Sequence, residues 1–229
     1  LRLHRHRCGG HCRRVRVLRF LIDGTGVAGG DGIELNNLNG SAKAVLIQGG
    51  RIRNCASSTS SNELGVGVAA FAERFVISDT HVKNIGLDGF HFKNGGAGIL
   101  IHDSTAEDCV RPTVIFQPKA GLVFEGVIAH DVYARRCLTG SSFVNPRGVF
   151  EITGSAGTAS GNSLHDLTAV DCGNATKDSH AALLGSTTTY SRKYNLTSVR
   201  QLGTAATGGT VHAANLSGGT NVIGSVISY

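Results

Sequence analysis

Side chains suited to acid–base chemistry gather between residues 88 and 151 of the chain. Asp88, His91 and Lys93 lie close together in the sequence, and Glu151 follows much later. His91 or Lys93 could serve as the base of an elimination reaction, and a pair of carboxyl groups is what a glycoside hydrolysis requires. We therefore assign Asp88, His91, Lys93 and Glu151 as candidate catalytic residues.

Four further side chains near this group are candidates for substrate binding, namely Arg111, Arg147, Gln117 and Glu34. An arginine could neutralise the carboxylate of an acidic sugar during a lyase reaction. In the arrangement derived below, two strand spacings of about 4.8 Å separate Asp88 from Glu151, which is at the upper limit for an inverting hydrolase. The alternative is that these charges only keep one face of the protein in solution.

Two other groups contain side chains that can bind metal. The first lies near the N-terminus and consists of His4, His6, Cys8, His11 and Cys12. The second consists of His102, His130 and His165, which lie in three consecutive repeats. Zinc sites usually draw their ligands from two separated elements, and the first group has no such partner. The second group fits an outward polar ladder, in which Gln48, Ser78 and Asn195 take the same position. We predict no metal and no cofactor, with calcium as the exception if the chain is a lyase.

An internal repeat must position all these side chains. Six copies of about ten residues align, and they end at Cys55, Ile85, Cys109, Cys137, Cys172 and Leu202. The steps between them are 30, 24, 28, 35 and 30 residues. Repeats of this length are typical of solenoid proteins, in which each repeat packs on its neighbours.

Each copy contains two short strands joined at a corner. The first strand points Ile47, Ile77, Ile101, Ala129, Leu164 and Tyr194 inward, the corner holds Gly49, Asp79, Asp103, Asp131, Asp166 and Leu196, and the second strand points Ile52, Val82, Ala106, Ala134, Ala169 and Val199 inward. A third strand precedes the next copy, with candidates at 32–35, 65–68, 89–92, 113–116, 149–152, 181–184 and 210–213. Alternating apolar residues in short segments favour half-buried strands. The sequence predicts an all-β fold, a right-handed parallel β-helix solenoid of about seven coils with three short strands per coil.

The positive charge of the chain is confined to its N-terminal end. The formal net charge is +6, but the first 20 residues hold seven arginines and no acidic residue. We interpret residues 1–14 as a basic arm, disordered or artefactual, and residues 15–229 as a single β-helix domain. The near-neutral remainder argues against nucleic-acid binding, and no apolar run is long enough for a membrane-spanning helix.

One repeat position is occupied by four cysteines: Cys55, Cys109, Cys137 and Cys172. Ile85 and Leu202 fill the same position in other copies, so the position favours a small buried hydrophobic side chain. Parallel stacking points these side chains in the same direction, which is poor geometry for a disulfide. We predict buried free thiols.

Segments 30–35 (Gly-Asp-Gly-Ile-Glu-Leu) and 81–90 (His-Val-Lys-Asn-Ile-Gly-Leu-Asp-Gly-Phe) resemble the repeat of the pectate-lyase-like right-handed β-helix superfamily. The resemblance covers residues 20–229 and implies a carbohydrate-related role, with a binding groove along the third-strand face. The Gly-His-Gly and Arg-x-Lys motifs of polygalacturonases and the Asp-Pro-His run of alginate epimerases are absent. The resemblance therefore does not select a reaction.

These observations predict a surface or secreted β-helix protein that binds a polysaccharide and, if it is an enzyme, cleaves it as a lyase or an inverting hydrolase. It would act outside the cell or on a cell or virion surface, as a monomer or homotrimer. The alternative is a non-catalytic structural solenoid such as an adhesin or a fragment of a phage tail fibre or tailspike. The absence of Trp favours this alternative, because sugar sites commonly use aromatic platforms.

Overall fold

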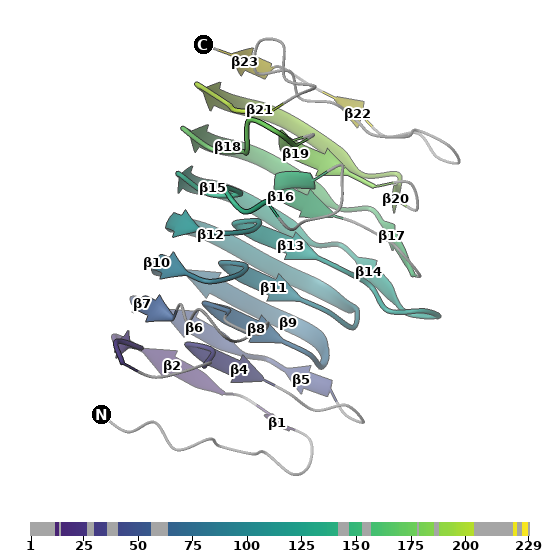
Figure 1. Ribbon diagram of the computed structural model, residues 1–229. Helices are drawn as coiled ribbons and strands as arrows, with labels where there is room; N and C mark the ends of the chain where they lie inside the picture. The colour runs from purple at the N-terminus through teal and green to yellow at the C-terminus, as the bar shows by residue number, and fades with distance from the viewer. Residues whose placement is uncertain are drawn as a thin grey trace.

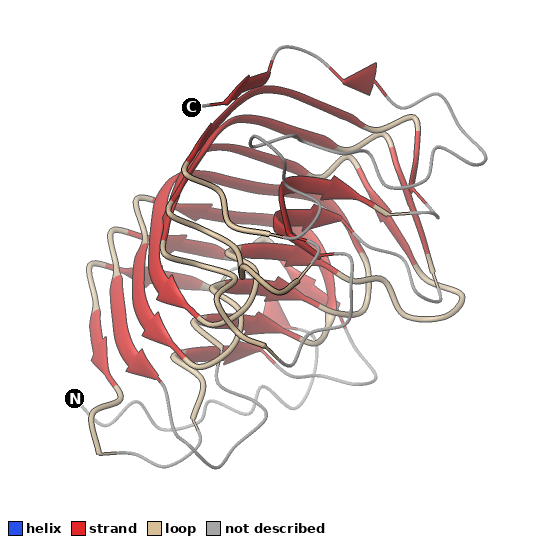
Figure 2. Ribbon diagram, turned by 45° about the horizontal axis from the view of Figure 1, so that its top comes forward, coloured by secondary structure: helices blue, strands red, loops and turns tan. Residues whose placement is uncertain are grey.

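The structure is a computed structural model, and it describes residues 12–13, 15–26, 30–35, 41–55, 64–141, 147–152, 157–177, 179–185, 188–203, 222–223 and 226–228. Over these residues the chain is all-β, without helices, and its strands pair in parallel. The strands form one sheet of 17 strands and a second sheet of six (Figures 1 and 2). No helix that could cross a membrane occurs in this described part of the chain.

The six-stranded sheet is formed by the segments predicted as third strands. In chain order it contains β4 (Ile33–Leu35), β8 (Val66–Val68), β11 (Phe90–Phe92), β13 (Val114–Phe116), β16 (Arg147–Ile152) and β19 (Ser179–Leu184). Each strand pairs with the one that follows it in this order, as Figure 1 shows. The seventh predicted segment, 210–213, lies outside the described residues.

The larger sheet collects the strands between these segments. They are β1 (Cys12–Arg13), β2 (Arg16–Leu18), β3 (Leu21–Asp23), β5 (Ser41–Lys43), β6 (Leu46–Gln48), β7 (Arg51–Cys55), β9 (Phe71–Ser78), β10 (His81–Ile85), β12 (Gly96–Cys109), β14 (Val123–Glu125), β15 (Ile128–Arg135), β17 (Thr158–Ser160), β18 (Ser163–Val170), β20 (Thr188–Thr189), β21 (Arg192–Val199), β22 (Val222–Ile223) and β23 (Val226–Ser228). The chain thus alternates between the two sheets. We call one strand of the six-stranded sheet, together with the part of the larger sheet that follows it, a layer. The first strand, β1, pairs with β5, so the two described residues of the predicted basic arm join the parallel ladder.

Residues with positive φ bend the larger sheet at the same place in every layer. At the corner these are Arg19, Gly49, Asp79, Asp103, Asp131, Asp166 and Asn195, with φ between 45° and 68°. In the last copy the corner is therefore Asn195 and not the predicted Leu196. A second set lies one strand earlier and consists of Ala44, Arg74, Gly98, Gly126, Gly161 and Tyr190. A third set lies at the ends of β7, β10, β12, β15, β18 and β21 and consists of Asn54, Asn84, Asp108, Arg136, Asp171 and Arg200. Asp, Asn and Gly enter this region of φ more easily than other residues, which explains the Asp-rich corner.

The core lies between the two sheets and is lined by the inward columns of each strand. Four phenylalanine side chains, at positions 75, 92, 116 and 124, form a continuous series of ring contacts with centroids 5.2 to 5.6 Å apart. All four are fully buried. Burial of one phenylalanine stabilises a fold by roughly 1.5–3 kcal/mol, so this series is a major part of the apolar core.

The last repeat is shifted by one residue from its predicted alignment. Leu164 pairs with Lys193 and His165 pairs with Tyr194, whereas the sequence pattern aligned Tyr194 with Leu164. The prediction was wrong because a lysine was not expected inside. In the structure Lys193 is fully buried and its Nζ atom donates a hydrogen bond to the carbonyl oxygen of Ala182 at 3.1 Å. By the same shift Leu202 leaves the cysteine column, and its side chain is exposed.

The cysteine column is confirmed as a set of buried free thiols. Cys55, Cys109, Cys137 and Cys172 are all free and buried, and Ile85 pairs with both Cys55 and Cys109. The sulfur atoms contact backbone and one another: the backbone N–H of Cys137 lies 3.3 Å from Sγ of Cys172. A hydrogen bond between the Cys109 and Cys137 thiols, together with burial, raises the pKa of Cys109, which makes this thiol unreactive.

Candidate functional site

The predicted catalytic residues lie on the outer face of the six-stranded sheet. His91 in β11 sits between Gly67 in β8 and Ile115 in β13, and Glu151 in β16 follows Ile115. Successive side chains of a strand alternate between its faces, so this column points away from the core between the sheets. Glu34 begins the same column in β4.

Asp88, His91 and Gln117 form one hydrogen-bonded group. Nδ1 of His91 lies 2.8 Å from Oδ2 of Asp88, and Nε2 lies 3.2 Å from Oε1 of Gln117. Burial acts to raise the pKa of Asp88, but the hydrogen bond and charge of His91 and the charges of Arg111 and Arg147 outweigh it and lower that pKa. A carboxylate beside Nδ1 orients the imidazole as in catalytic triads, but Nε2, which would have to take up the proton, faces the side-chain carbonyl oxygen of Gln117.

Glu151 forms a second group with Arg147. Nη1 of Arg147 donates to Oε1 of Glu151 at 2.7 Å, and the backbone N–H of Gly148 donates to Oε2 at 3.1 Å. Burial nevertheless raises the pKa of Glu151, despite the opposing effect of Arg147. The Nε atom of Arg111 is 3.8 Å from Oδ1 of Asp88, and neither of these two buried atoms has a hydrogen-bond partner among the described residues.

The outer face of the sheet is sealed at these residues, contrary to the predicted open groove. The side chains of Asp88 and Glu151 are 1% exposed and that of His91 is 5% exposed. The side chain of Leu64, itself buried, fills the space over Gly67, where an added Cβ would lie 2.6 Å from its Cδ1 atom. A polymeric substrate therefore has no access to the dyad formed by Asp88 and His91 in this conformation.

Lys93 and Glu34 are not part of the buried cluster. Lys93 is half-buried and Glu34 is exposed. Both contribute charge near Asp31, whose pKa is raised mainly by burial. The structure thus unites Asp88, His91, Gln117, Arg111, Arg147 and Glu151 and leaves the other two candidates at the edge.

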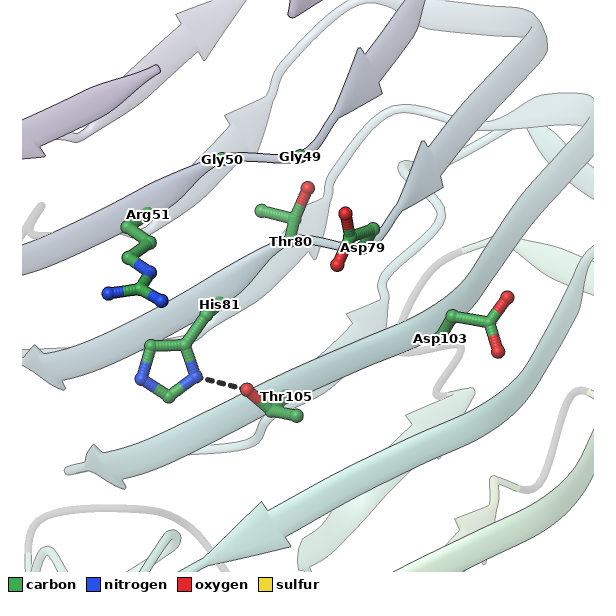
Figure 3. Close-up of a pocket in the computed structure, with 8 residues that line it drawn as sticks. All are labelled: Gly49, Gly50, Arg51, Asp79, Thr80, His81, Asp103 and Thr105. Atoms are coloured by element: carbon green, nitrogen blue, oxygen red, sulfur yellow. Dashed lines mark hydrogen bonds between the residues drawn. The ribbon is translucent and has the colours of Figure 1, made fainter. Parts of the chain in front are cut away.

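A hollow on the surface of the larger sheet was not predicted from the sequence. Its volume is about 500 Å³, and it is lined by Gly49, Gly50, Arg51, Asp79, Thr80, His81, Asp103 and Thr105 (Figure 3). These residues come from the corner and second strand of three consecutive layers, where Arg51 pairs with His81 and His81 with Thr105. The hollow is open and polar.

The hollow exists because Gly49 takes the corner position that Asp holds in the following layers. A Cβ atom at Gly49 would lie 3.6 Å from Cγ of Arg19 and 3.7 Å from Oδ2 of Asp79, so a side chain there would stand beside the Asp79 carboxylate. Gly50 points the other way, where Phe20 fills the space. The Gly-Gly pair was the sequence signal that could have identified this site.

The polar groups in the hollow include unpaired charges. Arg51 and Asp79 are exposed and form no ion pair with any described residue. His81 hydrogen-bonds through Nδ1 to the hydroxyl of Thr105, and burial is the main cause that lowers the pKa of His81 (Figure 3). The hollow therefore offers a guanidinium, carboxylates and hydroxyl groups to a ligand.

A ladder of histidines begins at the edge of the hollow. His102, His130 and His165 stack with ring centroids 5.3 and 5.1 Å apart, and Tyr194 stacks on His165 at 4.7 Å. In each layer Nδ1 of the imidazole lies 2.6 Å from a carboxylate oxygen of the next residue, Asp103, Asp131 or Asp166. The outward polar ladder predicted for these histidines is confirmed, but the residue that follows His165 in it is Tyr194 and not the predicted Asn195.

Among the described residues no group of three or more His, Cys, Asp or Glu side chains is arranged to hold a metal ion. The N-terminal candidates His4, His6, Cys8 and His11 lie outside the described residues, as does the side chain of Cys12. Comparisons with models of protein families, with curated proteins and with solved structures found no match to the chain.

Proposed function

We propose that the chain is a right-handed parallel β-helix that binds a polysaccharide in the hollow between Arg51 and Asp103, on a cell or virion surface. The fold part of this proposal is supported by the regular alternation of the chain between two parallel sheets. Crossover connections between parallel strands are right-handed in nearly all proteins. Three bends at constant positions in each layer also suit a continuous helical path.

The observation that carries the binding function is the hollow itself. Its volume of about 500 Å³ falls within the range of small-molecule sites, and its lining contains both hydrogen-bond donors and acceptors. Sugar hydroxyl groups donate to carboxylates such as Asp79 and Asp103, and they accept from a guanidinium such as Arg51. Since the hollow extends across three layers, it can contact a polymer that runs along the stack.

Cleavage by the buried dyad is not part of the proposal. A general base must come within hydrogen-bond reach of the proton that it removes, and the side chains of Asp88 and His91 are almost completely enclosed. Oδ2 of Asp88 and both ring nitrogens of His91 already have partners within the protein. The buried cluster thus supports a stabilising role for these residues.

The binding function is tested by filling the hollow. Asn in place of Gly49 should occupy it without unfolding the protein, because Asp and Asn take the same corner at positive φ in other layers. The control is Gly161→Asn. Gly161 has φ 65°, no atom lies within 4 Å of the added Cβ, and the residue follows β17, which does not line the hollow. Binding is measured by affinity electrophoresis in gels containing a polyuronate, a neutral glucan or a chitin-derived polymer.

We expect wild type and Gly161→Asn to be retarded by at least one polymer, and Gly49→Asn to migrate as in a gel without polymer. Arg51→Ala should weaken binding by about tenfold, the effect of losing one charged hydrogen bond. Equal retardation of all variants would place binding elsewhere on the protein. Retardation of none would reject polysaccharide binding.

A second candidate, a non-catalytic structural solenoid, is favoured by the side-chain ladders. Arg136 forms a bidentate pair with Asp108 of the preceding layer, and Arg200 forms the same pair with Asp171. Such ladders stabilise a stack and require no ligand. Failure of every polymer in the gel assay would make this the preferred function.

A further inference from the structure

We propose that His102 makes ligand binding in the hollow dependent on pH, acting through Asp103, which lines the hollow and also pairs with His102. The inference rests on the proposed polysaccharide binding and adds a form of regulation to the same site. It rests on one residue that belongs to both the hollow and the histidine ladder. Asp103 lines the hollow, and its Oδ2 atom is 2.6 Å from Nδ1 of His102.

Both members of this pair are accessible to protons. The side chain of Asp103 is 64% exposed and that of His102 is 25% exposed. Histidine is the side chain that ordinarily changes charge between pH 5 and 8. The pair can therefore change its charge state in the folded protein without an opening of the core.

The charged surroundings of His102 are defined by the stack. On the side of β15 lie His130 and its partner Asp131, and on the side of β9 lies Ser78, followed by Asp79 at the corner. Further along the ladder are His165 with Asp166, then Tyr194 with Arg192 at 6.0 Å from its ring. Across the hollow stand Arg51 and His81.

The two charge states of His102 affect Asp103 differently. A neutral imidazole donates one hydrogen bond to Oδ2 and leaves the carboxylate its full negative charge, so Oδ1 remains a strong acceptor for a sugar hydroxyl. A protonated imidazole forms an ion pair with the same carboxylate and reduces the charge available to the ligand. Binding should therefore weaken as the pH falls.

Stacking makes His102 the member of the ladder best placed for this role. Among the described residues its ring contacts one other imidazole, that of His130, because the neighbouring strand carries Ser78 at this position. His130 is flanked by imidazoles on both faces, and its partner Asp131 does not line the hollow. His165 has the same kind of Asp partner two layers away and does not reach the hollow.

The test compares His102→Gln with His165→Gln, which removes an equivalent imidazole from the far end of the ladder. Affinity for the polymer that retards the wild type is measured at pH 8.0 and pH 5.5. We expect the wild type and His165→Gln to bind roughly fivefold more tightly at the higher pH, the effect of weakening one hydrogen bond to a charged group. His102→Gln should show less than half of this change.

A second measurement follows the imidazole C–H signals by NMR without ligand. The titration of His102 should shift in Asp103→Asn, while that of His165 should not. Three results would each overturn the proposal and leave polysaccharide binding intact. They are equal pH dependence in both Gln variants, an unchanged His102 titration in Asp103→Asn, and binding by the wild type that does not vary with pH. Absence of binding at both pH values would instead reject the proposed function, and the regulation with it.

Discussion

The Nδ1 atom of His91 lies 2.8 Å from Oδ2 of Asp88, and these side chains are only 5% and 1% exposed. The pair thus combines an ordinary charged hydrogen bond with nearly complete exclusion of water. Breaking a buried charged pair by removing one partner is strongly destabilising, because the remaining group stays desolvated. Five predictions concern the stability of the fold, four at buried side chains and one at an exposed bend.

Replacement of Asp88 by Asn should reduce the free energy of unfolding by about 3 to 5 kcal/mol at pH 7. The pKa of Asp88 is lowered in the folded protein, so the ionised carboxylate stabilises the fold above its ordinary pKa of 3.8. This contribution should disappear as the pH falls from 3.8 through the lower pKa that Asp88 has in the folded protein. Urea denaturation of wild type and variant at neutral and acidic pH measures both effects.

Glu151→Gln is the matched comparison for Asp88→Asn. Burial raises the pKa of Glu151 above 4.5, so the linkage has the opposite sign and ionisation of this residue lowers stability as the pH rises through that value. The loss at pH 7 should be smaller than for Asp88→Asn, although the contact with Arg147 is weakened. Equal losses would contradict the different roles assigned to the two carboxylates.

Lys193→Met should stabilise the protein by about 2 kcal/mol at pH 7, since the cost of a buried amine exceeds its hydrogen bond to Ala182. Burial lowers the pKa of Lys193 to about 7, from 10.5 in the unfolded chain. The unfolded state therefore binds more protons between these values, and wild-type stability should rise with pH across this window. Chemical denaturation at pH 7.0 and 9.5 should show that rise in the wild type and not in the variant.

Arg74→Gly should raise the melting temperature by about 2 °C. Arg74 has φ 52°, and the next three layers hold Gly98, Gly126 and Gly161 at the same bend. Glycine adopts the left-handed conformation without the steric cost of a Cβ atom, and this gain exceeds the cost of its greater flexibility in the unfolded chain. The reverse change, Gly98→Ala, should lower the melting temperature in differential scanning calorimetry; a rise there would refute the strain argument.

Cys109→Ala should cost about 1 to 2 kcal/mol by creating a small cavity at a fully buried position. Cys109→Val should cost less, because Ile85 occupies the equivalent position in the adjacent layer. Thiol titration should leave the four column cysteines unreactive in the native protein and find all four reactive after unfolding without reductant. A disulfide between Cys109 and Cys137 in peptide mapping would contradict the free-thiol assignment.

The repeat in the sequence was sufficient to predict which residues stack in neighbouring layers. The pairing of His102 with His130 and of Ile85 with Cys109 follows from parallel strands, in which residues at the same repeat position become direct neighbours. The prediction failed at Tyr194, because the observed alignment places Lys193 inside, where an apolar side chain was expected. Only the structure shows that stacking of Tyr194 on His165 accompanies burial of Lys193.

The sequence by itself determined the all-β parallel architecture, the Asp-rich corner and the grouping of Asp88 and His91, because all of these are repeated or local features. The tertiary structure alone decided that this grouping is sealed from solvent while the space beside Gly49 is open. Exposure depends on how side chains such as that of Leu64 pack over a face, and those segments differ in length and sequence from layer to layer. A periodic pattern carries no information about such non-periodic contacts, which is why the repeat alone did not show that the face carrying Asp88 and His91 is closed to solvent.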